Sequence, residues 1–169
     1  MSKSKIVGIM SLVVFAMGIV LAGDVVAGEK GKVVAREVFY RTNILRLNIP
    51  DVEGHTMHLV EAKLIHFNEK FGPAVGILTN FADVTKGTGP HQGYVHLTFS
   101  DGSTITHKWK GESKGGGTTI SGVASSVGTW SFIKGTGKFE GIQGEGTWKS
   151  YNLGPGQWYS DLEGEYKLP

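Results

Sequence analysis

Three histidines lie within a short stretch of the chain, at His91, His96 and His107. Imidazole nitrogens bind zinc and related metals, and a hairpin could bring two of these side chains together. The chain has no cysteine, and no cluster of acidic residues completes a ligand set, so no metal site is expected. His107 lies in an apolar stretch with Trp109 close by, and it is the polar group best placed to face a protein interior. His55 and His58 flank a predicted turn and are expected to be surface residues.

Carboxylates are the next candidates for chemistry. Glycoside hydrolysis requires two carboxylates at a controlled separation in one cleft, and nothing in the sequence places such a pair. Glu37 and Glu61 lie within predicted strands and could face an interior if the register allows. His107 and Glu61 are therefore the candidates for an acid or base, and no catalytic residue is assigned. No cofactor is expected.

All four tryptophans fall after residue 108. In a small barrel, inward aromatic rings either line a ligand pocket or fill the core, and both interpretations stay open. The candidates for a cavity lining are the inward-facing residues of the predicted strands, namely Val95, Leu97, Phe99, Ile105, His107, Trp109, Trp130 and Trp148.

The elements that position these residues are short strands. Many of the 26 glycines punctuate runs of β-branched and aromatic residues, which is typical of strands joined by tight turns. Strands are expected at 33–40, 44–49, 56–67, 74–82, 93–99, 103–110, 118–124, 128–134, 144–151 and 159–168.

One hairpin can be predicted in detail. Ser100-Asp101-Gly102 reads as a three-residue loop with Gly102 in the left-handed conformation. This register pairs Leu97 with Ile105 and Val95 with His107, and it gathers the apolar side chains on one face. A two-residue loop, the alternative, would pair His96 with His107.

So many short antiparallel strands in one domain predict a sandwich or a closed barrel. Closure is favoured because it removes exposed edges. The expected fold is all-β, an eight-stranded antiparallel closed barrel with a ninth strand as the alternative, formed by residues 28–169.

Residues 1–27 have the features of a secretory signal peptide. A basic start at Lys3 and Lys5 precedes an uncharged stretch over 6–22, and small residues follow. Cleavage is expected after Ala22 or Ala27. The rival interpretation, an uncleaved membrane anchor, is weaker because the stretch is short for a bilayer and no basic stop-transfer run follows. The expected location is the bacterial periplasm or the exterior, where a cysteine-free domain depends on packing alone.

Charge excludes one class of partner. The whole chain carries a formal net charge of +2. Removal of residues 1–27 takes away two lysines and Asp24, so the net charge falls by one. This balance gives no nucleic-acid surface. Contact with a membrane is expected only through the signal peptide, during export.

One segment resembles a known family. Gly135-Thr136-Gly137, Phe139, Gly141 and Gly144 form a turn-and-strand element similar to that of the allene oxide cyclase-like and dirigent-like barrels, within the calycin-like group. The physical interpretation agrees, because the glycines let the backbone turn sharply while Phe139 and Ile142 plug the barrel end. The resemblance implies an eight-stranded barrel, often trimeric, with an apolar cavity that shapes a small hydrophobic molecule.

Three functions follow as hypotheses. The first is an exported barrel that binds a small hydrophobic ligand in its interior and guides its cyclisation or coupling, by confinement more than by acid or base groups. The second is a non-catalytic structural or interaction module of the cell envelope. The third is an acid–base isomerase or hydrolase that uses a cavity His or Glu.

Overall fold

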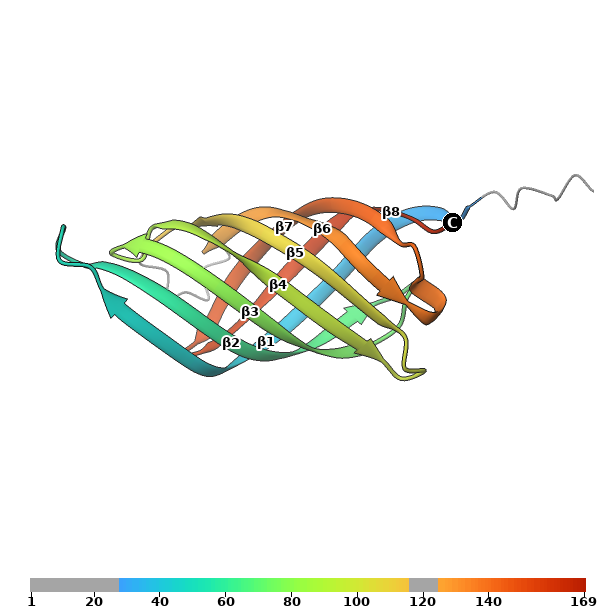
Figure 1. The fold of residues 1–169 in the computed structure, drawn as a ribbon, viewed down its shortest axis with the longest axis horizontal. Coiled ribbons are helices and arrows are strands. Elements are labelled where there is room, and N and C mark those ends of the chain that lie inside the picture. The colour runs from blue at the N-terminus through green and yellow to red at the C-terminus, as the bar shows by residue number, and fades with distance from the viewer. Residues whose placement is uncertain (1–27, 116–124) are drawn as a thin grey trace, which may run out of the picture.

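Eight antiparallel strands form one closed barrel (Figure 1). The computed structural model describes residues 28–115 and 125–169. The predicted signal peptide over 1–27 and the expected strand over 118–124 lie outside these described residues. Each strand pairs with the next, and β1 (Lys30–Asn48) pairs with β8 (Gln157–Lys167) to close the sheet. The predicted all-β, eight-stranded antiparallel barrel is confirmed.

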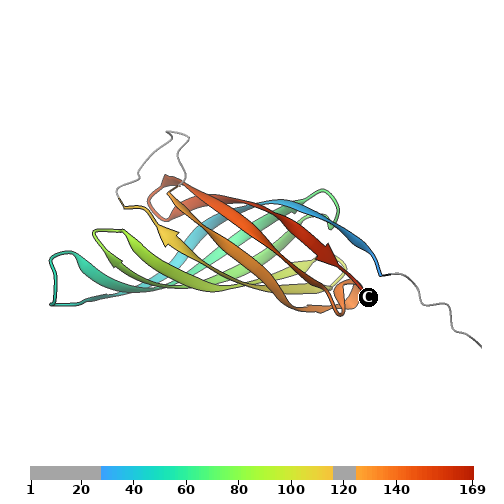
Figure 2. The same ribbon diagram turned by 90° about the horizontal axis from the view of Figure 1, so that it is seen from above.

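The barrel has two different ends. The C-terminus and a short 3-10 helix, η1 (Gly137–Phe139), lie at one end, and the hairpin of β1 and β2 (His55–Asn68) extends beyond the other end (Figures 1 and 2).

The remaining elements are β3 (Ala74–Thr85), β4 (Gly89–Phe99), β5 (Thr104–Ser113), β6 (Ser126–Thr136) and β7 (Gln143–Gly154). Within 28–115 and 125–169, no helix is long and apolar enough to cross a membrane.

A β-bulge in β1 joins two of the predicted strands. The segments 33–40 and 44–49 are one strand, and its register against β2 shifts between Arg41 and Asn43. Before the bulge the odd-numbered residues, such as Glu37 and Phe39, are buried. One extra residue in the strand reverses this alternation, because side chains alternate with a period of two.

The β4–β5 hairpin has the predicted register. Leu97 pairs with Ile105, and Val95 pairs with His107. The loop is the expected three residues, since the Phe99 amide donates to the Ser103 carbonyl at 2.9 Å and Gly102 has a φ of +81°. His107 is therefore buried, while His96 lies on the outer face.

The glycine motif closes one end of the barrel, as predicted. Gly137 and Gly141 have φ values of +62° and +73°, which turn the chain through η1 and into β7. Phe139 and Ile142 are buried. The Phe139 ring packs edge-on against Phe71 at 5.1 Å between centroids and lies 4.6 Å from Phe99. This end is filled with rings.

Glycines make room for the inward tryptophans. Trp148 is in register with Gly128, and a Cβ atom at Gly128 would lie 2.7 Å from the Trp148 ring. Trp109 and Gly93 have the same relation, at 2.9 Å. The missing side chain on the facing strand leaves room for each of these indoles in a narrow barrel.

Gly128→Ala should therefore destabilise the fold. The new methyl group would meet the Trp148 ring and the Lys110 carbonyl, and such overpacking costs roughly 1–3 kcal/mol. Chemical denaturation of the purified barrel measures the loss. Thr129→Ala, on the exposed neighbouring residue, is the control and should change stability little. Equal stability of the Gly128→Ala variant and the wild type would show that the glycine is not needed for ring packing.

Candidate functional site

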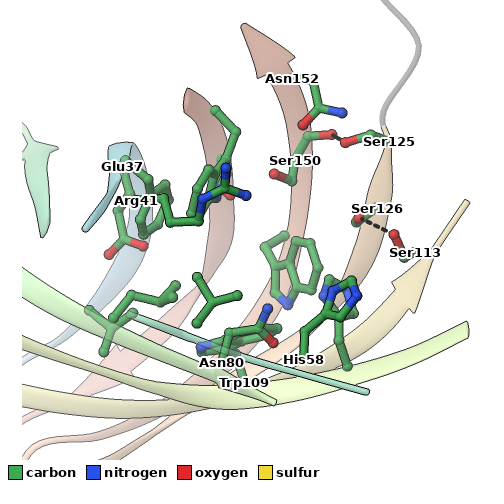
Figure 3. Close-up of a pocket in the computed structure, with 18 of the residues that line it drawn as sticks. Glu37, Arg41, His58, Asn80, Trp109, Ser113, Ser125, Ser126, Ser150 and Asn152 are labelled. Carbon is green, nitrogen blue, oxygen red and sulfur yellow. Dashed lines mark hydrogen bonds between the residues drawn. The ribbon is translucent and has the colours of Figure 1, made fainter. Parts of the chain in front are cut away.

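The half of the barrel away from η1 holds a cavity of about 290 Å³ (Figure 3). All eight strands contribute to its lining. The cavity exists because the inward side chains change in size along the barrel axis. Phenylalanines fill the closed end, whereas serines such as Ser113, Ser126, Ser150 and Ser160 face inward near the open end.

Aromatic rings form the walls of the cavity. Phe39 and Trp158 stack in parallel, with centroids 5.1 Å apart and planes 9° from one another. Trp109 and Trp148 meet at right angles, 5.6 Å apart. His91 packs edge-on against both of these indoles. The walls are therefore apolar and rigid, as in pockets that bind hydrophobic molecules.

A buried carboxylate lies at the floor. Glu37 is only 2% exposed, and its Oε1 lies 3.1 Å from His66 Nδ1 and 3.3 Å from His107 Nε2. Glu37 and His107 border the cavity, and His66 lies behind them in the closed half. Both imidazoles are also buried, so the three side chains form one polar cluster inside the barrel.

The histidines keep Glu37 ionised. Burial by itself would raise the pKa of Glu37, but the charge and hydrogen bond of His107, together with those of His66, outweigh it and lower the pKa to about 2. The Glu37 carboxylate is therefore stabilised inside the barrel by its contacts with the two imidazoles.

Besides His66 Nε2 and His107 Nδ1 of the cluster, three buried polar atoms on the wall have no hydrogen-bond partner among the described residues. They are Asn80 Oδ1, His91 Nε2 and Trp109 Nε1, on the neighbouring strands β3, β4 and β5. Burial lowers the pKa of His91 to about 4, so its ring is neutral near pH 7. Buried polar atoms normally have partners, and these atoms offer a donor and an acceptor to a molecule in the cavity.

The open end is lined by charged and hydroxyl groups. Arg41 and Arg46 reach the cavity from β1, and His58 faces it from β2. Figure 3 shows Glu37 and Arg41 on one side and Ser113 and Ser126 on the other. The Ser126 hydroxyl lies 3.5 Å from that of Ser113.

The predicted lining residues divide into two groups. Val95, His107, Trp109 and Trp148 border the cavity. Leu97, Phe99, Ile105 and Trp130 also face inward, but they pack in the filled half. The strand pattern indicates which face a side chain occupies, whereas the distance along the barrel axis depends on how the strands are staggered.

Two predictions need correction. Glu61 lies exposed on the outer face, where its carboxylate is 3.1 Å from the Thr42 hydroxyl, so its candidacy as a cavity acid or base is wrong. Its neighbours Val60 and Ala62 take the inward positions. His58, expected on the surface beside a turn, instead lines the cavity.

Several residues of the site were not found from the sequence. His66 continues the inward alternation of Val60, Ala62 and Leu64, so the strand pattern alone could have located it. Arg41 and Arg46 could not be found in this way because the bulge lies between them.

No family model and no curated protein matches the chain. Two similar solved structures are the pterocarpan synthase dirigent proteins GePTS1 and PsPTS1, each 15% identical to this chain with a TM-score of 0.49. The first match covers 95% of this chain and 97% of GePTS1, and the second covers 84% of this chain and 97% of PsPTS1.

The buried cluster predicts a specific acid response. Because the pKa of Glu37 is lowered from 4.5 to about 2, its ionised form contributes stability above pH 4.5 that is lost as the pH falls toward 2. Glu37→Gln keeps the shape and removes the charge. From about pH 6 to about pH 2, the free energy of unfolding of the wild type should fall by on the order of 3 kcal/mol more than that of the variant.

Urea denaturation at a series of pH values measures this difference. Glu61→Gln is the matched control, because it makes the same chemical change on the outer face, and it should follow the wild type. A Glu37→Gln variant that loses stability in parallel with the wild type would contradict an ionised Glu37.

Proposed function

We propose that this chain is an exported barrel that binds a small hydrophobic molecule in its open half. The observation that carries the proposal is the cavity, about 290 Å³ in volume and walled by Phe39, Trp109, Trp148 and Trp158. An apolar cavity of about 150 Å³ accepts one benzene ring. The cavity of this barrel therefore suits a molecule of about two rings.

Confinement is the simplest way for such a cavity to act on its ligand. Rigid walls hold a flexible molecule near one conformation, and this alone accelerates a cyclisation or coupling. The unpartnered atoms of Asn80, His91 and Trp109 would fix the orientation of an oxygen-bearing group. In this proposal the cavity holds the ligand in a single orientation.

Acid–base catalysis is the second candidate, and the cluster at the floor favours it. Glu37 and His107 both border the cavity and are hydrogen-bonded to each other. A carboxylate that orients an imidazole is a common arrangement for proton transfer. The pair would move a proton at the inner end of a bound molecule. Turnover that is lost in Glu37→Gln while binding persists would support this role.

A surface role draws on a different feature. The outer faces of β1, β2 and β3 carry exposed apolar side chains, among them Val38, Ile65 and Ile77. An interaction module would use such a face and would need no lumen. We give the ligand-binding function priority because a filled barrel would be more stable than one with a polar-lined cavity.

Filling the cavity should abolish binding. Val60 lines the cavity and its neighbour Leu59 is exposed on the outer face, so Val60→Phe and Leu59→Phe form a matched pair. A neutral two-ring probe, 2-naphthamide, should quench tryptophan fluorescence in the wild type and in Leu59→Phe. Val60→Phe should weaken its binding at least about tenfold. Equal affinities for the two variants, or no binding to the wild type, would sink the proposal.

Mass spectrometry tests export and the natural ligand together. Expressed with residues 1–27 in a bacterial host, the protein should appear in the periplasmic fraction with its N-terminus at Gly23 or Gly28. Under native conditions a fraction of the protein should carry one extra small molecule. Retention of Met1 in a membrane fraction would contradict cleavage, and wild-type protein that is always free of ligand would count against the binding proposal.

A further inference from the structure

The β1 bulge brings two arginines to the mouth of the cavity. Arg41 and Arg46 are five residues apart, so regular alternation would place them on opposite faces. The register shift between Arg41 and Asn43 adds one residue, and both arginines therefore line the cavity, with Ile44 between them. The only other arginine in the chain, Arg36, lies on the outer face of the same strand.

These two guanidinium groups have no carboxylate partner among the described residues. Arg36, in contrast, forms two hydrogen bonds with Asp161, at 2.7 and 2.9 Å. The one carboxylate that borders the cavity is Glu37, and its Oε1 is taken by His66 and His107. The mouth therefore carries an uncompensated positive charge.

The neighbours of the two arginines add no charge and hold this part of β1 in place. His58 is paired with Arg46 across β1 and β2. Burial, then the charges of Arg46 and Arg41, lower the pKa of His58, so its ring adds no charge near pH 7. The Arg41 amide donates to the Gly156 carbonyl at 2.8 Å, which holds this part of β1 against the β7–β8 turn.

We infer that the ligand of this cavity is a compact hydrophobic acid, with a body of about two rings against the tryptophans and a single carboxylate at Arg41 and Arg46. This inference rests on the proposed function. A planar guanidinium donates two parallel hydrogen bonds to a carboxylate, which a lysine does not. The lining contains no lysine and holds two arginines against one carboxylate, so one negative charge balances it.

A pair of probes that differ in charge tests the inference. 2-Naphthoate and 2-naphthamide share the ring system and nearly the same shape, but only the first is an anion. The wild type should bind 2-naphthoate at least about tenfold more tightly than 2-naphthamide, because hydrogen bonds to charged groups are the stronger ones. This preference should shrink as sodium chloride is added, while 2-naphthamide binding stays constant.

Substitutions of single arginines test which residues cause the preference for 2-naphthoate. Arg41→Gln and Arg46→Gln should each weaken 2-naphthoate binding about 10- to 100-fold and change 2-naphthamide binding less than about threefold. Arg36→Gln removes the same charge from the outer face of the same strand, and it should leave both affinities unchanged. Thermal melting of each variant verifies that it is folded, and the salt titration of the wild type tests the inference without any substitution.

The outcomes separate this inference from the proposed function. Equal binding of the two probes to the wild type, or an effect of Arg41→Gln no larger than that of Arg36→Gln, would overturn the acid specificity and leave the cavity as a binding site for neutral molecules. If neither probe binds, the proposed function fails, and this inference fails with it.

Discussion

The pairing of β1 with β8 is the contact on which the rest of this structure depends. It runs from Lys30 opposite Lys167 to Tyr40 opposite Gln157 and turns an open sheet into a barrel. A closed sheet has no free edge, and all its inward side chains share one narrow lumen. The same strand that closes the barrel also supplies the charged groups of the lumen, Glu37, Arg41 and Arg46. Strand β1 therefore both closes the barrel and carries the charged side chains of the candidate site.

Side-chain volume divides this lumen into two halves. At the end that holds η1, Phe71, Phe99 and Phe139 meet ring against ring and leave no room for a ligand. Toward the mouth, serines replace the phenylalanines, and Trp109 and Trp148 lie against the wall because glycines face them. Part of the abundance of glycine thus has a packing cause, since these indoles fit a barrel this narrow where the neighbouring strand lacks a side chain.

Much of the fold could be predicted from the sequence because β-structure depends on local alternation. The β4–β5 register could be predicted from Gly102 in the loop, and because it places the apolar Leu97 and Ile105 on the same face. The site was harder to predict. Alternation indicates that Glu37 and Glu61 lie in strands, but only the pairing with both neighbours shows that the first faces in and the second out. The alternation of apolar and polar residues also does not reveal a bulge, because an extra residue such as the one near Thr42 leaves no compositional signal.

The order of groups along β1 gives the lumen a direction. Glu37 is tied to two histidines at the floor, and Arg41 is four residues further toward the mouth, about 13 Å along an extended strand. The opposite charges are separated along the strand, because Glu37 is buried beside two imidazoles whereas the arginines lie where the barrel opens. Between them the walls are aromatic. An acid bound at the arginines would therefore present its far end to Glu37 and His107, and the spacing of the charges along one strand would decide which atom of the ligand meets these two side chains.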